Sequence, residues 1–159
     1  MSSQAPGPEK PSQAQQGAPL ETPLQAAKAP VEAYNEKNWH RLRSVVTPDF
    51  VYEEVATQRR LEGVDAVMAC WQAWARAFPD SRATFDGEFV TERGVVVLEV
   101  TWSGTHTGLL ELPGGPVAPT NRPIRLQSCQ VLGLRNGKAQ SIRQYFDIAT
   151  LLQQLGMLP

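Results

Sequence analysis

The chain has 159 residues, which is the usual size of one domain and is long enough to bury a hydrophobic core without metals or disulfides. Hydrophobic residues make up 42% and charged residues 19%, and the formal net charge is -1, so this globular composition gives no electrostatic reason to expect nucleic acid. A small, mostly neutral ligand is the more natural partner.

The N-terminal segment differs in composition from the rest of the chain. Residues 1–19 are rich in Pro, Gln, Ser and Gly, which predicts a disordered tail ahead of one domain over residues 20–159. Cys70 and Cys129 lack the paired spacing of a zinc site or a disulfide framework. No apolar run approaches the ~20 residues of a spanning helix, and no signal peptide is evident. We therefore expect an unsecreted, cytoplasmic protein.

Helical spacing dominates the first half of the domain. Thr22 is a capping residue, and apolar residues follow it at steps of three and four as far as Tyr34. Pro30 removes a backbone donor inside this run, so we expect a kink or a late start there. A short helix is expected over residues 39–46, and a longer one over residues 63–78 with an apolar stripe.

A period of two marks the strands. We expect strands over residues 50–55, 85–89, 95–107, 124–134 and 138–147, a loop over residues 109–119 that shapes a pocket mouth, and a terminal helix through Leu155. In the strand over residues 95–107, His106 falls on the same side as Trp102. Helices followed by antiparallel strands predict an α+β fold in which helices cover one face of a curved sheet.

The dipeptide Asn136-Gly137 predicts a two-residue hairpin between the last two strands. Stepping outward from this turn pairs Gln130 with Arg143, Ser128 with Tyr145 and Leu126 with Asp147 on one face. We take this face as the pocket side, because it gathers four polar groups among leucines: Gln130, Arg143, Tyr145 and Asp147. The reverse face carries Cys129, Val131, Ile142, Gln144 and Phe146. Since both faces are half apolar, we expect a homodimer packed on the sheet.

Several short motifs occur together in one order. They are Gly104-Thr105-His106-Thr107-Gly108, Pro119-Thr120-Asn121-Arg122, Asn136-Gly137-Lys138, and Asp147 followed by Leu151-Leu152-Gln153-Gln154-Leu155-Gly156. From about Leu24 onward, the chain resembles the SnoaL-like polyketide cyclases, or ester cyclases, of the nuclear transport factor 2-like superfamily. Two positions depart from the family pattern: Arg143 stands where a tryptophan is common, and Asn121 where a glycine is usual.

The resemblance implies a cone-shaped barrel of helices against a curved sheet, frequent dimers and no cofactor. It also implies an intramolecular aldol ring closure in which Asp147 is the acid-base group. A carboxylate among apolar groups would have a raised pKa and be a stronger base, and loss of turnover in Asp147→Asn would follow. Asp147 could instead cap the terminal helix, which begins directly after it.

The remaining site residues also have two interpretations each. His106 could orient substrate or donate a proton, or it could be a core residue. Arg143 could hold a substrate carboxylate or ester, or extend outward. The aromatic residues could line a cavity for a planar polycyclic ligand or form plain core: Tyr34, Tyr52, Trp71, Trp74, Phe78, Phe89 and Trp102. The expected substrate-binding residues are five of these aromatics and three residues of the last hairpin: Tyr34, Tyr52, Trp71, Trp74, Trp102, Gln130, Arg143 and Tyr145.

Three functions fit these expectations. The first is a cofactor-independent cyclase for an aromatic or polycyclic, carbonyl-rich small molecule. The second is an epoxide hydrolase or epoxide-opening cyclase, for which Asp86 is a possible second aspartate, although its alternation with Phe85 turns it away. The third is a non-catalytic binding or dimerisation module. We expect no metal, nucleotide or membrane partner, because the chain has no glycine-rich phosphate loop and no ligand-spaced histidines.

Overall fold

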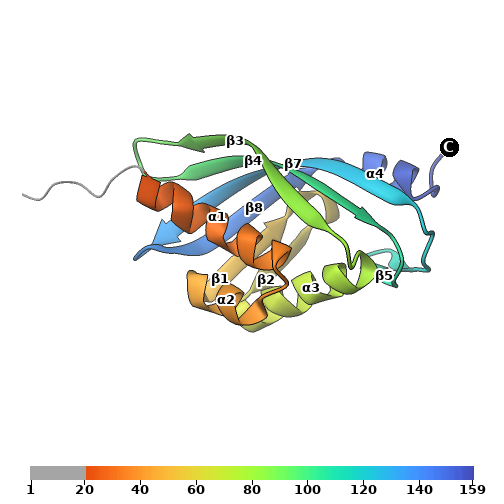
Figure 1. Ribbon diagram of the computed structural model, residues 1–159, viewed down its shortest axis with the longest axis horizontal. Coiled ribbons are helices and arrows are strands. Elements are labelled where there is room, and N and C mark those ends of the chain that lie inside the picture. Colours follow the sequence, from red (N-terminus) through yellow and green to blue (C-terminus); the bar gives the residue numbers. More distant parts are fainter. Residues whose placement is uncertain (1–20) are drawn as a thin grey trace, which may run out of the picture.

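The computed structural model describes residues 21–159, so the expected tail over residues 1–19 lies outside the described residues. Three helices in the first half of the chain cover one face of a curved sheet, while a fourth lies at the C-terminal end (Figure 1). The helices are α1 (Glu21–Asn35), α2 (Trp39–Val45), α3 (Val64–Ala77) and α4 (Ile148–Gln154), and a 3-10 turn η1 spans Val55–Thr57. The strands are β1 (Val46–Glu54), β2 (Arg59–Glu62), β3 (Arg82–Val90), β4 (Val96–Thr105), β5 (Leu110–Leu112), β6 (Gly115–Val117), β7 (Pro123–Arg135) and β8 (Lys138–Phe146).

The sheet confirms the α+β prediction. Its six strands run in the order β2-β1-β8-β7-β4-β3, and all pairs are antiparallel except β1 with β8. The sheet is curved but does not close into a barrel, because β2 and β3 are edge strands. The segment expected as a plain loop over residues 109–119 contains the small hairpin of β5 and β6, and β2 was not expected either.

Helix α1 runs through Pro30 without a break, so the expected late start is wrong. A proline inside a helix costs one backbone hydrogen bond. Burial of the inner face of α1 offsets that cost, because Ala27, Val31 and Tyr34 are almost fully buried against the sheet. The polar side chain of Asn35 then fastens the end of α1 to β3: its amide donates to the carbonyl of Ala83 at 2.9 Å and accepts from the N–H of Ala83 at 2.7 Å.

The hairpin of β7 and β8 starts in the predicted register and then departs from it. Arg135 pairs with Lys138 and Leu134 with Ala139, but the next pair is Gly133 with Ser141, so Gln140 is an extra residue on β8. Such a bulge moves every later side chain to the opposite face. Gly133 has no side chain at this point, and a Cβ there would lie 2.7 Å from the Ser141 hydroxyl.

The face exchange reverses the predicted inside and outside of β8. Ile142 and Gln144 are buried on the concave face, whereas Arg143, Tyr145 and Asp147 are exposed. The prediction that the Asp147 face is the pocket side is therefore wrong for β8, because a bulge lies between the turn and that face. Among residues 21–159, no helix is long and apolar enough to cross a membrane.

Candidate functional site

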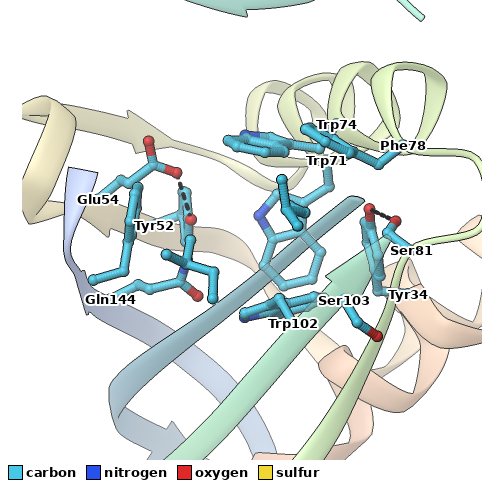
Figure 2. A pocket seen from close by; sticks show the side chains of 13 residues that line it. Tyr34, Tyr52, Glu54, Trp71, Trp74, Phe78, Ser81, Trp102, Ser103 and Gln144 are labelled. Carbon is cyan, nitrogen blue, oxygen red and sulfur yellow. Dashed lines mark hydrogen bonds between the residues drawn. The ribbon is translucent and has the colours of Figure 1, made fainter. Parts of the chain in front are cut away.

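An aromatic pocket lies between the helices and the concave face of the sheet (Figure 2). The pocket and the open solvent at its mouth together make up about 600 Å³ of free space. The side chains come from α1, α3 and the strands: Tyr34, Tyr52, Glu54, Trp71, Trp74, Phe78, Ser81, Trp102, Ser103, Ile124, Leu126, Gln144 and Phe146. The pocket is mostly apolar, so its few polar groups fix how a ligand can be oriented.

Edge-to-face packing holds the aromatic walls. The ring of Tyr34 stands nearly perpendicular to those of Trp71 and Trp102, with centroid distances of 6.1 and 5.2 Å. Trp74 and Phe78 stack at 5.4 Å on the same helical segment. Such pairs stabilise the packing beyond their buried area and make the walls flat and rigid. A planar apolar ligand suits these walls.

A buried carboxylate lies at one end of the pocket. Glu54 closes β1, whose alternate residues Phe50, Tyr52 and Glu54 all face inward, and it is only 1% exposed. The Tyr52 hydroxyl donates to its Oε2 at 2.9 Å, and the Thr57 hydroxyl donates to its Oε1 at 2.6 Å. Arg59 Nη2 lies 3.7 Å from Oε1. Burial and the neighbouring Glu54 raise the pKa of Tyr52 well above its usual value, so this hydroxyl remains a donor.

Two buried amides lie next to this carboxylate. Gln144 pairs with Glu54 across β8 and β1, and both side chains line the pocket. Gln130 on β7 donates from its Nε2 to the Gln144 Oε1 at 2.7 Å. This bond fixes the Gln144 amide and leaves its NH₂ group without a partner among the described residues, so two N–H donors remain for a ligand oxygen. Gln130 supports Gln144 and does not itself line the pocket.

Two hydroxyls meet at the other end of the pocket. The hydroxyls of Tyr34 and Ser81 lie 2.7 Å apart, and both residues line the pocket. Burial raises the pKa of Tyr34, so its hydroxyl remains protonated. Figure 2 shows this pair across the indole rings from Glu54 and Gln144.

Asp147 lies outside the pocket as the N-cap of α4. Its Oδ1 accepts from the N–H of Ala149 at 2.9 Å, and its Oδ2 accepts from the Thr150 hydroxyl at 2.7 Å. These donors, the Thr150 side chain foremost, lower its pKa, whereas the sequence analysis expected desolvation to raise it. The expected pKa direction is wrong because Asp147 is exposed and hydrogen-bonded to a helix terminus. Its catalytic role stays a prediction that the geometry does not favour.

Capping by Asp147 predicts a specific effect on stability. A carboxylate with a lowered pKa stabilises the fold above its unfolded-state pKa, and that stabilisation is lost as the pH falls through the folded-state pKa. We expect Asp147→Ala to lower the thermal midpoint at pH 7, and the difference from the wild type to shrink below about pH 4. Asp147→Asn should keep most of the stability, because asparagine is an equally good cap. Circular-dichroism melts check this, and equal losses in both variants would contradict it.

His106 lies in the core beside the pocket wall. It is fully buried, its Nδ1 accepts from the N–H of Thr120 at 3.2 Å, and its ring packs on Phe78 at a centroid distance of 5.1 Å. Its Nε2 has no hydrogen-bond partner among residues 21–159. Burial lowers its pKa, so the imidazole is neutral at pH 7. His106 does not line the pocket, and its acid-base role stays a prediction.

The other expected site residues divide between the two faces. Tyr34, Tyr52, Trp71, Trp74 and Trp102 line the pocket as expected. In contrast, Arg143 and Tyr145 face outward, where Arg143 Nε donates to Glu53 at 3.1 Å, because of the bulge in β8.

Two further side chains named in the sequence analysis also lie outside the pocket. Phe89 on β3 is 55% exposed, so the expectation that it could line the cavity is wrong. Asp86 accepts from the Thr101 hydroxyl on the outer face at 2.5 Å, as its alternation with Phe85 indicated. Asp86 therefore does not supply the second aspartate that an epoxide hydrolase of this kind would need inside the pocket.

Glu54, Ser81 and Gln144 line the pocket but were not predicted as site residues. The signal for Glu54 was available, since Phe50, Tyr52 and Glu54 share one side of a strand with period two, and an acid on an apolar side is unusual. Gln144 was placed on the reverse face because the bulge was not anticipated. Ser81 lies in the turn between α3 and β3, where the sequence holds no periodic signal.

The polar groups of the pocket suit proton transfer to and from carbon. A desolvated carboxylate can accept a proton, and the adjacent amide N–H groups can stabilise the oxygen anion that forms. No group of three or more His, Cys, Asp or Glu side chains with metal-site geometry occurs in the part of the chain that the structure describes.

Comparisons with known proteins show the family and the fold of this chain. The family model of the SnoaL-like polyketide cyclases matches residues 24–155. A search of curated proteins finds no match. Among solved structures, IdmH from Streptomyces antibioticus, a candidate polyketide cyclase, is 26% identical with a TM-score of 0.70 over 84% of this chain and 98% of that one. A candidate SnoaL-like polyketide cyclase from Jannaschia sp. CCS1 is 16% identical, with a TM-score of 0.76 over 92% and 100%. A protein with a ketosteroid isomerase-like fold from Catenulispora acidiphila is 18% identical, with a TM-score of 0.69 over 85% and 94%.

Proposed function

We propose that this chain, which belongs to the SnoaL-like polyketide cyclase family, catalyses the acid-base ring closure of a flat, carbonyl-rich small molecule in its aromatic pocket. The family match and the cyclase-named structural neighbours support a cyclase-like role. The reaction is an intramolecular aldol closure that needs no cofactor. Glu54 replaces Asp147 as the proposed acid-base group.

The mechanism uses the two neighbours at one end of the pocket. Glu54 removes a proton from a carbon next to a substrate carbonyl, and the Gln144 N–H groups donate to the enolate oxygen. The enolate carbon then forms a C–C bond with a second carbonyl carbon, whose π bond becomes an alkoxide. Glu54 returns its proton to that alkoxide, so the residue ends the cycle as it began.

One observation carries this proposal: a carboxylate that is 1% exposed lines an aromatic pocket directly beside a fixed amide donor. Burying a carboxylate away from water costs several kcal/mol unless donors surround it, and here the hydroxyls of Tyr52 and Thr57 and the guanidinium of Arg59 offset that cost. Tyr52 and Thr57 each occupy one acceptor site of Glu54, and a carboxylate has roughly four. Arg59 lies against Oε1, so the acceptor site that remains on Oε2 is the one proposed for substrate.

Deuterium exchange tests the proposal without knowledge of the natural substrate. 2-Tetralone is a bicyclic ketone with one aromatic ring and with acidic protons on the CH₂ between its carbonyl and that ring. We expect the wild-type protein to accelerate exchange of these protons in D₂O, followed by proton NMR, above the buffer rate. If 2-tetralone quenches the pocket tryptophans but exchanges at the buffer rate, the proposal fails and the binding-module interpretation gains.

We also propose that the chain forms a homodimer through the outer face of the sheet. Tyr145 is 42% exposed there, and Phe89, Val97, Cys129 and Val131 add apolar surface on the same face. Tyr145→Asp should shift the mass to that of a monomer in light scattering at micromolar concentration. Asp147→Asn, which changes a cap at the end of the sheet, is the control and should leave the mass unchanged. A wild type that is monomeric would contradict the dimer.

A further inference from the structure

The hydroxyl pair of Tyr34 and Ser81 has one donor more than it uses. Two hydroxyls carry two hydrogens, and the bond between them consumes one whichever residue donates. Neither hydroxyl makes another hydrogen bond among residues 21–159. Both residues are almost fully buried and line the pocket, so the spare donor is available to a ligand and shielded from bulk water.

The structure holds this pair in place from several directions. Lys37 Nζ donates to the Ser81 carbonyl at 2.6 Å and lies 4.2 Å from the centroid of the Tyr34 ring. Lys37 itself has a φ of 52°, the left-handed conformation that directs its side chain back to the end of α1. The Asn35 amide ties the same end of α1 to β3, just after Ser81. These contacts fix the backbone of Ser81 and the ring of Tyr34 at this end of the pocket.

The hydroxyl pair and Glu54 stand at opposite ends of the pocket. Glu54 is on β1, and Ser81 immediately precedes β3, with β8, β7 and β4 between the two strands in the sheet. The indole rings of Trp71 and Trp102 line the pocket between the two ends (Figure 2). A ligand that uses both ends needs a long apolar body with an oxygen at each end.

We propose that Tyr34 and Ser81 form a second oxygen-binding subsite of the pocket. The substrate is then an elongated, flat molecule with a carbonyl or other oxygen acceptor at the end remote from the carbon that Glu54 deprotonates. This inference rests on the proposed function of the same pocket. Tyr34 and Ser81 select and orient the substrate, whereas Glu54 and Gln144 act on it.

Binding of two matched probes tests the subsite. 2-Acetylnaphthalene carries a carbonyl oxygen, and 2-ethylnaphthalene has the same shape without it. Quenching of tryptophan fluorescence should show that the wild-type protein prefers the ketone by about fivefold, since a net hydrogen bond contributes roughly 1 kcal/mol. The preference should disappear in the Tyr34→Phe/Ser81→Ala double variant, which removes both hydroxyls and keeps the ring.

The controls separate loss of this subsite from a general loss of the pocket. Unchanged affinity for 2-ethylnaphthalene in the double variant shows that the pocket is intact. If the double variant does not fold, Tyr34→Phe/Ser81→Cys is used, which replaces the Ser81 hydroxyl with a thiol of similar size that is only a weak donor, and the preference should fall there. Glu54→Gln should retain the preference even where it abolishes exchange, so a failed proposed function leaves this test valid. Three results would overturn the proposal. The wild type could show no preference for the ketone, the preference could survive the loss of both hydroxyls, or it could disappear only in Gln144→Leu.

Discussion

Glu54→Gln is expected to slow deuterium exchange of 2-tetralone by about 100- to 10,000-fold, the usual contribution of a general base. Glutamine has the shape of glutamate and can still accept from the Tyr52 hydroxyl, but its amide does not take up a proton from carbon. The loss should appear in the rate at saturating 2-tetralone. The binding constant should change little, because the aromatic walls provide most of the contact.

Glu53→Gln is the matched control for this prediction. Glu53 is the preceding residue on β1 and carries the same side chain, but it faces the opposite side of the sheet and pairs with Arg143 at 3.1 Å. The Glu53→Gln variant should exchange the protons of 2-tetralone at the wild-type rate. Equal losses in Glu53→Gln and Glu54→Gln would indicate a general effect of charge or folding and would reject Glu54 as the base.

The same assay decides between Glu54 and Asp147. The sequence-based hypothesis predicts that Asp147→Asn loses turnover. The position of Asp147 at the start of α4 instead predicts that this variant keeps the wild-type rate. Asparagine also preserves the cap, so a loss of rate in Asp147→Asn could not be assigned to unfolding. Such a loss would restore Asp147 as the acid-base group.

Regular elements with one buried side were predictable from the sequence. Apolar spacing of three and four gave α3, and period two gave the two sides of β4, because burial on one side of a regular element repeats with the element. The turn residues Asn136 and Gly137 gave the first two pairs of the last hairpin correctly.

The site was harder to predict because one bulge controls it. Gln140 on β8 exchanges the faces of every later residue, which brings Gln144 into the pocket and turns Arg143 outward. The sequence of β8 alone does not mark this bulge, because it depends on a contact between two strands. The side chain of Ser141 on β8 packs over Gly133 on β7. Glu54 needed no such contact to be found, because its position follows from the period of β1 alone.

Gly108→Ala is expected to destabilise the protein by about 3 kcal/mol, the upper part of the range for overpacking. A Cβ on Gly108 would lie 2.0 Å from the Arg76 carbonyl oxygen, and the N–H of Gly108 donates to the Ala77 carbonyl at 3.0 Å. Both contacts are with the backbone at the end of α3, which cannot move aside as a flexible side chain would. The glycine that ends the Gly104–Gly108 motif is therefore explained by close approach of two backbones.

Gly114→Ala is the matched control, because a Cβ on Gly114 would meet no atom within 4 Å in the turn between β5 and β6. Urea unfolding at pH 7 should show a clear loss of stability for Gly108→Ala and little change for Gly114→Ala. The end of α3 also supplies Trp74 and Phe78 to the pocket. The Gly108→Ala protein that does fold should accordingly bind 2-acetylnaphthalene more weakly than the wild type. Equal stability and equal binding in the two variants would show that Gly108 does not fix the position of the end of α3.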